Sequence, residues 1–134
     1  MNPMTTHGAF SWNELMTTDV PAAKAFYSAL FGWTYEEMTI GGEGDSAGMT
    51  YTSALLGKEW AGGMMGMPPT VQGVPPHWGC YVTVNDVDAT LAQVEKLGGR
   101  VLVPAFDVPG VGRMAVLQDP QGAVLSIARY AFDG

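Results

Sequence analysis

Positively charged residues are scarce in this chain of 134 residues, which contains six lysines and arginines against 13 aspartates and glutamates, for a formal net charge of −7. A nucleic-acid-binding protein needs a stripe of basic side chains to displace the counterions of the phosphate backbone, and docking on an anionic membrane needs a similar patch. The sequence therefore predicts neither a nucleic acid nor a membrane as a partner. We expect an acidic, solvated surface instead.

Cysteine is nearly absent as well, since Cys80 is the sole example. One cysteine excludes an internal disulfide and fits a reducing compartment, so we expect a cytoplasmic protein. Cys80 lies within an apolar run, which predicts a buried and unreactive thiol. The first seven residues lack the basic and apolar segments of a signal peptide, and no apolar run is long enough to span a bilayer.

Apolar residues, by contrast, are plentiful, because 47% of the chain is hydrophobic and only 14% is charged. That balance favours a compact fold over disorder, and the length favours a single domain, 1–134. An internal repeat divides this domain, since an offset of 67 positions pairs Asp19 with Asp86 and Leu30 with Leu97. The expected boundaries are about 8–66 for module one, about 67–76 for a proline-rich linker and about 77–131 for module two.

Each module predicts the same order of elements. An alternating strand is followed by an aspartate suited to an N-cap, a helix, a glycine that ends the helix and three further strands. We expect strands near 10–17, 34–40, 49–56, 60–65, 78–84, 100–103, 112–117 and 123–128, helices over 20–31 and 87–97, and turns at 41–45 and 119–122. The apolar stripe of the first helix is expected to face the core, and it consists of Ala22, Ala23, Phe26, Tyr27, Leu30 and Phe31.

Five short motifs in this order resemble the vicinal oxygen chelate superfamily of glyoxalases, bleomycin-resistance proteins and dioxygenases. They are Trp12-x-Glu14-Leu15-x-x-x-Asp19, Ala25-Phe26-Tyr27-x-x-Leu30-Phe31-Gly32-Trp33, Asp86-Val87-Asp88-Ala89, Leu97-Gly98-Gly99 and Asp119-Pro120-Gln121-Gly122-Ala123. The resemblance implies an α+β protein in which two tandem βαβββ modules form a cup-shaped mixed sheet, the glyoxalase/bleomycin-resistance/dihydroxybiphenyl dioxygenase fold. It does not imply one activity, because the superfamily includes lyases, isomerases, dioxygenases, epimerases and non-catalytic drug-binding proteins.

The resemblance also implies where metal ligands would lie, because the metal enzymes of the family place four inward His, Gln or Glu side chains around a divalent ion. The corresponding positions here are Trp12, Gly79 and Ser126, with Gly62 or Gly63 as the fourth. These residues do not suit a hard or borderline cation. We therefore expect neither a metal nor another cofactor, although the sequence leaves open an atypical site built from His77 and Glu14.

Side chains on the inward face of the cup are the candidate ligand-binding residues. They are Trp12, Glu14, Met16, Trp60, His77, Tyr81 and Arg113, with Phe10 and Met64 as further apolar lining. An apolar hollow with a few polar points is typical of a small-molecule site, in which Trp12 either stacks on a planar ligand or fills the cup as core. Glu14 is the candidate catalytic acid or base, because desolvation in the cup would raise the pKa of its carboxyl. Arg113 is either a contact for an anionic ligand or a surface arginine beside a hairpin.

Three functions remain open on the sequence alone, and it does not decide whether the chain is an enzyme. The favoured function is metal-independent binding of an aromatic or amphipathic small molecule, of the kind found among bleomycin-resistance proteins. The alternative is a glyoxalase-like lyase or isomerase, or a hydroxylase- or dioxygenase-like enzyme, that uses Glu14 as acid or base or an atypical metal site. The third is a structural or regulatory dimer, and the resemblance implies a homodimer for the other two as well.

Overall fold

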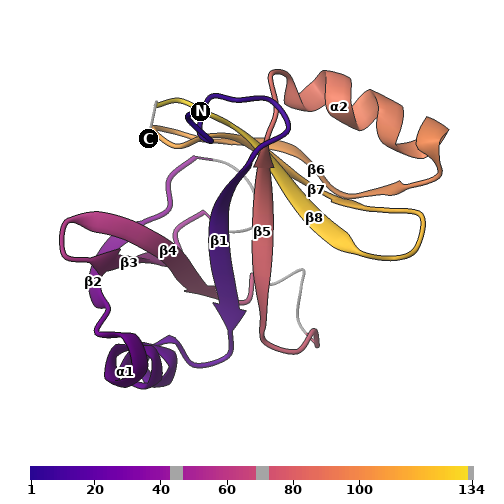
Figure 1. The fold of residues 1–134 in the computed structure, drawn as a ribbon. Coiled ribbons are helices and arrows are strands. Elements are labelled where there is room, and N and C mark those ends of the chain that lie inside the picture. The colour runs from indigo at the N-terminus through magenta and orange to yellow at the C-terminus, as the bar shows by residue number, and fades with distance from the viewer. Residues whose placement is uncertain (43–46, 69–72, 133–134) are drawn as a thin grey trace. The chain divides into compact units, whose positions relative to one another are not determined.

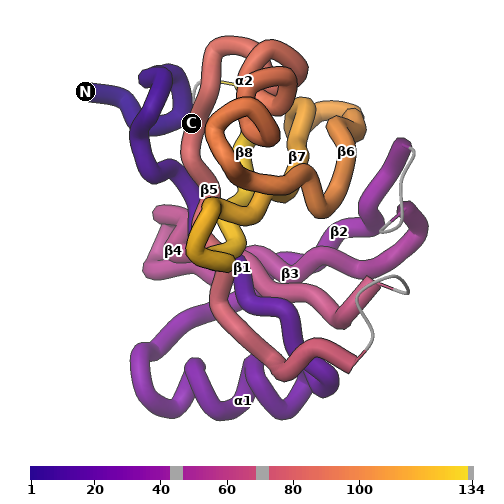
Figure 2. Tube along the Cα trace, turned by 90° about the vertical axis from the view of Figure 1, so that its right-hand side faces the viewer, coloured from indigo at the N-terminus to yellow at the C-terminus, as the bar shows by residue number. Residues whose placement is uncertain are grey.

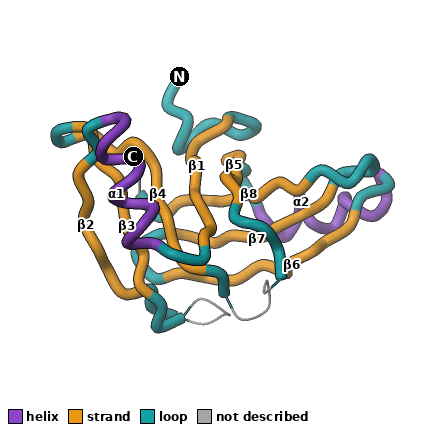
Figure 3. The backbone as a smooth tube through the Cα atoms, turned by 90° about the horizontal axis from the view of Figure 1, so that it is seen from below, coloured by secondary structure: helices purple, strands orange, loops and turns teal. Residues whose placement is uncertain are grey.

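The computed structural model describes residues 1–42, 47–68 and 73–132, which form eight strands and two α-helices (Figures 1 and 3). In chain order the elements are β1 (Phe10–Thr17), α1 (Val20–Phe31), β2 (Thr34–Thr39), β3 (Thr50–Leu56), β4 (Glu59–Gly66), β5 (His77–Thr83), α2 (Val87–Val94), the 3-10 turn η2 (Glu95–Leu97), β6 (Arg100–Val108), β7 (Gly112–Gln118) and β8 (Val124–Tyr130). The expected turn at 41–45 and the middle of the expected linker lie largely outside the described residues. No helix of the described chain is long and apolar enough to cross a membrane.

The chain divides into two compact units with the same internal strand order. Of the described residues, one unit holds 13–41, 47–68 and 73–78, and the other holds 1–12, 42 and 79–132. The strands of the first module follow the order β2-β3-β4-β1, and those of the second follow β6-β7-β8-β5. In each set the first strand of the module pairs in parallel with the last, while the remaining pairs are antiparallel. This duplication confirms the α+β class built from two βαβββ modules.

Both helices begin where the sequence predicts, and α1 also ends there. The α-helix α2 ends at Val94, and the last predicted turn to Leu97 is the 3-10 turn η2. The carboxylate of Asp19 accepts a hydrogen bond from the Ala22 N–H at 3.0 Å, and Asp86 accepts one from Ala89 at the same distance. Each aspartate thereby satisfies one of the N–H groups that the first turn of a helix leaves unpaired. Gly32 ends α1 at a φ of 73°, in the left-handed region that favours glycine.

The second unit contains a conventional core. Val87 of α2 packs against Ala115 of β7 and Ile127 of β8, and all three are almost fully buried. Figure 2 shows α2 lying along the strands β6, β7 and β8. Because burying apolar surface contributes about 25 cal/mol per Å², this helix-on-sheet contact stabilises the unit.

The first helix departs from the expected burial pattern. No residue of α1 is buried, and Phe26 and Leu30 of its predicted core stripe are 59% and 58% exposed. The inward side of α1 is held by hydrogen bonds near its edges, from the Tyr35 hydroxyl to the Lys24 carbonyl and from the Ser28 hydroxyl to the Trp33 carbonyl. The expectation that the whole stripe faces the core was wrong, because α1 is apolar around most of its circumference and only one side can face a sheet.

Two further expectations were wrong in detail. Strand β6 continues through Pro104 to Val108, which an edge strand permits because proline need not donate to a neighbour there. Cys80 is exposed rather than buried. At the N-terminus, His7 Nδ1 accepts a hydrogen bond from the Asn85 N–H at 2.9 Å. The turn at 119–122 was correct, since the Asp119 carboxylate accepts from the N–H of Gln121 within it and from the N–H of Ala123 just after it.

The N-cap of α1 gives a stability prediction. Asp19→Ala removes the acceptor for the Ala22 N–H and should lower the free energy of unfolding by about 1 kcal/mol, as measured by urea denaturation. Asp19→Asn is the matched control, because asparagine caps helices as well as aspartate does. A loss in the asparagine variant as large as in the alanine variant would show that the charge, and not the cap, is what matters.

Candidate functional site

The sheet of the first module has two distinct faces. Leu15 and Thr17 of β1 line a hollow together with Ala22 and Ala23 of α1, so these strand residues face the helix. Because side chains alternate along a strand, Glu14 and Met16 point to the opposite side. We call this side the Glu14 face, and the strand register assigns to it Glu14, Met16, Tyr51, Ser53, Gly63 and Met65.

A buried carboxyl lies on the Glu14 face. Glu14 is only 8% exposed, and its register partner across the parallel β1–β4 pair is Gly63. A carboxyl removed from water requires hydrogen bonds or charge partners, which makes it an unusual feature of a sheet surface. The burial of Glu14 agrees with the sequence-based expectation that it lies away from bulk solvent.

The phenol of Tyr51 occupies the space above Gly63. A Cβ atom placed on Gly63 would lie 1.9 Å from the Tyr51 hydroxyl oxygen and 2.4 Å from the ring carbon that bears it. Glycine at this position is therefore what allows the tyrosine to lie over β4, next to the strand that carries Glu14. The carboxyl on β1 and the phenol on β3 thus lie on one face of the sheet, on either side of β4.

The register also distinguishes the two glycines considered for the fourth metal-ligand position. Gly63 shares the Glu14 face, whereas Gly62 faces the other way and approaches the Trp78 ring. A ligating side chain at Gly63 would collide with Tyr51, and Trp12, Gly79 and Ser126 offer no imidazole or carboxylate. These positions do not fit a divalent ion. Within residues 1–42, 47–68 and 73–132, no three His, Cys, Asp or Glu side chains come together as a metal site would require.

In the sheet of the second module, the corresponding face carries Tyr81 and Ser126. These two residues are register partners in the parallel β5–β8 pair, and both are partly buried. By alternation they lie opposite the face that packs on α2, because their neighbours Val82 and Ile127 belong to the α2 core. Each module therefore covers one face of its sheet with its own helix and presents polar and aromatic side chains on the other.

Four of the expected ligand-binding residues lie on two strands of the first module. Trp12, Glu14 and Met16 are on β1, and Trp60 is on β4. Trp12 lies two residues before Glu14 on β1, and Met16 two residues after it. Trp60 is paired with Leu55 through a bulge, and Leu55 alternates with Tyr51 and Ser53. Of the two further residues expected to line the cup, Phe10 is largely exposed, while Met64 is buried on the helix side as the partner of Leu15.

His77 lies apart from that group at the start of β5. Its imidazole is exposed, with Nδ1 2.8 Å from the Pro75 carbonyl oxygen. It lines the same hollow beside α1 as Leu15 and Thr17, on the helix side of the first sheet. Because Glu14 points to the opposite side of that sheet, the two side chains are not placed as a pair of metal ligands.

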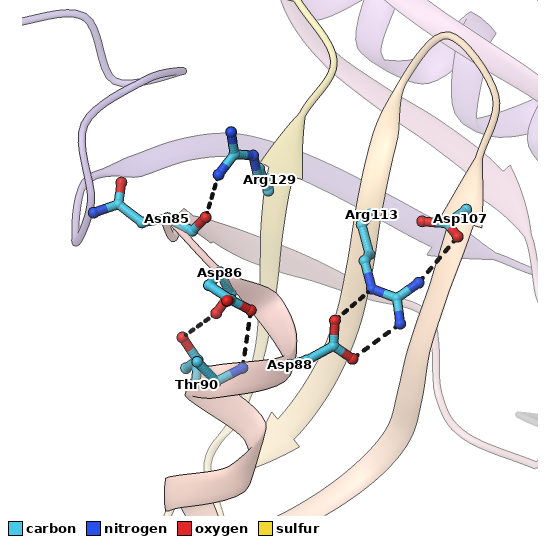
Figure 4. A network of polar contacts seen from close by, with 8 residues as sticks. Asn85, Asp86, Asp88, Thr90, Asp107, Arg113 and Arg129 are labelled. Carbon is cyan, nitrogen blue, oxygen red and sulfur yellow. Dashed lines mark hydrogen bonds and ion pairs between the residues drawn. The ribbon is translucent and has the colours of Figure 1, made fainter.

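Arg113 is engaged in ion pairs on the helix side of the second sheet (Figure 4). Its Nε and Nη2 atoms donate to the two carboxylate oxygens of Asp88 on α2 at 2.8 and 2.9 Å, and Nη1 donates to Asp107 on β6 at 3.0 Å. The hydrogen bond from Arg113 holds the pKa of the Asp88 carboxyl below its usual range. The guanidinium thus joins α2 to the β6–β7 hairpin, and the structure does not bring it together with Tyr81 and Ser126.

Sequence inspection missed Tyr51, Ser53 and Met65, which the register adds to the Glu14 face. Alternation along the predicted strand 49–56 does place Tyr51 and Ser53 on the same side of that strand. Whether this side is the Glu14 face depends on the pairing of β3 with β4, because a shift of one residue would move both side chains to the other face. The sequence alone could not supply that register.

A tandem βαβββ protein with a buried carboxyl on one sheet face defines a recognisable class, and comparisons with known proteins identify the family. The model of the Glyoxalase/Bleomycin resistance protein/Dioxygenase superfamily matches residues 9–127. The chain belongs to this family.

Relatives and solved structures agree with that assignment. A putative glyoxylase named CFP32 from Mycobacterium tuberculosis is 41% identical over 121 residues, which cover 90% of this chain and 45% of the relative. The anthracycline biosynthesis protein DauV of Streptomyces sp. strain C5 is 34% identical over 91% of this chain and 47% of its own length. The chain thus spans about half the length of these relatives. Methylmalonyl-CoA epimerase from M. tuberculosis shares the fold, with a TM-score of 0.62 and 16% identity over 93% of this chain and 89% of the epimerase.

The contact between Tyr51 and Gly63 gives a second stability prediction. Gly63→Ala should destabilise the protein by about 1–3 kcal/mol, the usual cost of overpacking, because the new methyl group must displace the phenol. Gly66→Ala on the same strand is the matched control, since its Cβ would meet only the end of the Met49 side chain at 3.6 Å. In a Tyr51→Ala background the Gly63→Ala cost should largely disappear; an undiminished cost would place its origin in the backbone.

The Arg113 ion pairs give a pH-dependent prediction. Because Arg113 depresses the pKa of Asp88 in the folded state, the pair stabilises the fold above the ordinary aspartate pKa of about 3.9 and loses that effect as the pH falls through the lower folded-state value. Asp88→Asn should therefore be less stable than the wild type at pH 7, with the difference vanishing in strong acid and shrinking in high salt. Glu95→Gln serves as the control for removing an exposed acid nearby. A difference independent of pH would exclude the ion pair as its source.

Proposed function

We propose that this protein binds an aromatic or amphipathic small molecule on the Glu14 face, and that it does so without a metal ion or other cofactor. The single observation that carries the proposal is the buried Glu14 carboxyl beside Tyr51, on the sheet face opposite α1. Membership of the family supplies the general setting, since that family's name covers enzymes and a resistance protein alike.

The chemistry of the Glu14 face suits a ligand with both apolar and polar parts. Met16 and Met65 are register partners that supply adaptable apolar surface, and Trp60 supplies an exposed indole. Tyr51 and Ser53 add hydroxyls that hydrogen-bond in either direction. Glu14 adds a carboxylate that would pair with a cationic or hydroxyl-bearing ligand. Predominantly apolar lining with a few polar groups is the common composition of small-molecule sites.

The proposal of metal independence rests on the donor set. The four positions at which the family's metal enzymes place ligands hold an indole, two glycines and a hydroxyl, and the Gly63 position is filled by the Tyr51 phenol. A hydroxyl alone is a poor ligand for zinc and a weak one for magnesium or manganese. We therefore assign recognition to stacking, apolar contact and hydrogen bonds.

The names of the relatives support the ligand class. DauV is named for anthracycline biosynthesis, and an anthracycline is a planar polycyclic aromatic compound with polar substituents. A ligand of that general kind fits an indole and methionines flanking a carboxylate. The acidic composition and lone cysteine support a cytoplasmic protein that binds neither nucleic acid nor membrane.

A second candidate function is catalysis with Glu14 as general acid or base. Its specific support is the burial of Glu14, because ionisable groups withheld from water are typical of sites that transfer protons. CFP32 is itself named a putative glyoxylase. The Tyr51 phenol, which β3 places over β4 on the same face, would serve as hydrogen-bond donor to an oxyanion formed on the substrate. In this candidate the same face binds the molecule and then acts on it.

A binding experiment tests the proposal. Titration with planar aromatic compounds, followed by tryptophan fluorescence and calorimetry, should give micromolar dissociation constants that a chelator leaves unchanged. Glu14→Gln and Trp12→Ala should each weaken binding at least about tenfold, equivalent to roughly 1.4 kcal/mol. Glu37→Gln is the matched control, because it removes a carboxylate from β2 that pairs with Lys24 of α1 on the helix side.

Three outcomes of that experiment decide between the candidates. Unaltered affinity in both Glu14→Gln and Trp12→Ala would contradict the proposed site. Loss of binding on chelation would contradict metal independence. Chemical conversion of a bound compound by the wild type and not by Glu14→Gln, with binding retained in the variant, would establish the catalytic candidate in place of simple binding.

A further inference from the structure

The outward side of α1 is an apolar stripe exposed to solvent. Residues spaced three or four apart along this side form one continuous strip, and they are Ala22, Ala25, Phe26, Ala29 and Leu30, all exposed. Phe31 at the end of the helix is 54% exposed as well. A surface helix of a globular protein normally turns charged and polar residues outward, so α1 is reversed in this respect.

The duplicated architecture provides an internal comparison for this helix. An offset of 67 positions relates the outward stripe of α1 to residues of α2 and η2, namely Ala89, Ala92, Gln93, Lys96 and Leu97, which are also exposed. The second module thus has glutamine where α1 has Phe26, and lysine where α1 has Ala29. The two helices occupy equivalent places in their modules, yet only α2 has the composition of a solvated surface.

Charge is absent from the stripe in a chain that is strongly acidic overall. The one charged side chain within α1 is Lys24, and it turns inward to pair with Glu37 at 3.0 Å. Two copies of a chain with a net charge of −7 repel each other over most of their surfaces. The α1 stripe carries no charged side chain and so adds nothing to that repulsion, which favours a second copy as the occupant. A basic partner would bind the acidic surface instead.

The size of the apolar surface matches the centre of a protein interface. Phe26 and Phe31 together leave on the order of 200 Å² of aromatic surface in water, given the area of a phenylalanine side chain and their exposed fractions. Leu30 and the 40% exposed Trp78 extend the surface to several hundred Å². A stable interface buries roughly 800 Å² on each partner, of which the central part is apolar.

The shape of the region suits helix-on-helix packing. Ala22, Ala25 and Ala29 keep one ridge of α1 low, so that a second helix could approach to the usual axial distance of about 8 Å. A hollow of about 450 Å³ adjoins the stripe, sharing Ala22 and Phe26 with it and extending to His77 and Trp78. Two of the side chains that line the hollow hold each other in place, because Trp78 donates a hydrogen bond to the Tyr27 hydroxyl at 3.1 Å and packs edge-on against that ring.

From these observations we infer that the outward stripe of α1 is the contact surface of a symmetric homodimer, in which it packs against the same stripe of a second copy. An isologous contact of this kind needs a self-complementary surface, and a neutral strip of alternating large and small apolar side chains meets that need. The inference is independent of the proposed ligand site, which lies on the other face of the sheet.

The test grafts the residues of the second module onto the first. The double variant Phe26→Gln, Ala29→Lys gives α1 the side chains that α2 and η2 carry at the equivalent places, and Leu97→Gln is the matched control on η2. Sedimentation equilibrium from micromolar to millimolar concentration should give twice the chain mass of 14.2 kDa for the wild type and for the control. The double variant should dissociate at least about tenfold more readily.

Folding and function are monitored alongside the mass. Because all the altered side chains are exposed, circular dichroism and ligand binding of the monomeric variant should match those of the wild type; Leu30→Lys provides a second, single-site variant with the same expected dissociation. A wild type that remains a monomer at millimolar concentration would overturn the inference. So would a dimer that both the double variant and Leu30→Lys leave unchanged, since the contact would then lie elsewhere.

Discussion

The alternation of side chains along β1 is the constraint on which the rest of this account depends. One set of side chains, including Leu15, faces α1. Because side chains alternate along a strand, the other set, including Glu14, points to the opposite face. A one-residue shift in the pairing of β1 with β4 would exchange the two sets. In the adjoining β3–β4 pair, the Tyr51 phenol lies over Gly63, where a larger residue would collide with it. The position of the buried carboxyl is therefore a consequence of how the first sheet packs on its helix.

Duplication explains much of the architecture, and divergence between the copies explains what is particular to this protein. Both modules use an aspartate to cap the helix and a parallel pair between first and last strands. They differ in what the helices show to solvent, since α2 and η2 expose Gln93 and Lys96 where α1 exposes Phe26 and Ala29. They differ also in how the helix is held, because the Arg113 ion pairs tie α2 to the β6–β7 hairpin. The two modules thus share an architecture but differ in the exposed surface of the helix and in the contacts that hold it.

Local signals made most of the fold predictable from the sequence. The caps at Asp19 and Asp86, the stop at Gly32 and the turn at Asp119 each depend on a few neighbouring residues, and each was located correctly. Features that depend on distant pairing were not predictable in the same way. The extension of β6 past Pro104 required knowledge that it is an edge strand, and the contribution of Tyr51 required the β3–β4 register. The exposure of α1 was missed because apolar spacing shows that a helix has an apolar side without showing whether a sheet covers it.

The most direct test of the account is to locate a bound ligand by NMR. Backbone amide and methionine methyl shifts would be recorded while a planar aromatic ligand is titrated into isotopically labelled protein. The account predicts that the largest changes fall on Glu14, Met16, Gly63 and Met65, with the amides of α1 and α2 little affected. Changes concentrated on α2, or in the hollow between α1 and His77, with the Glu14 face silent, would contradict it.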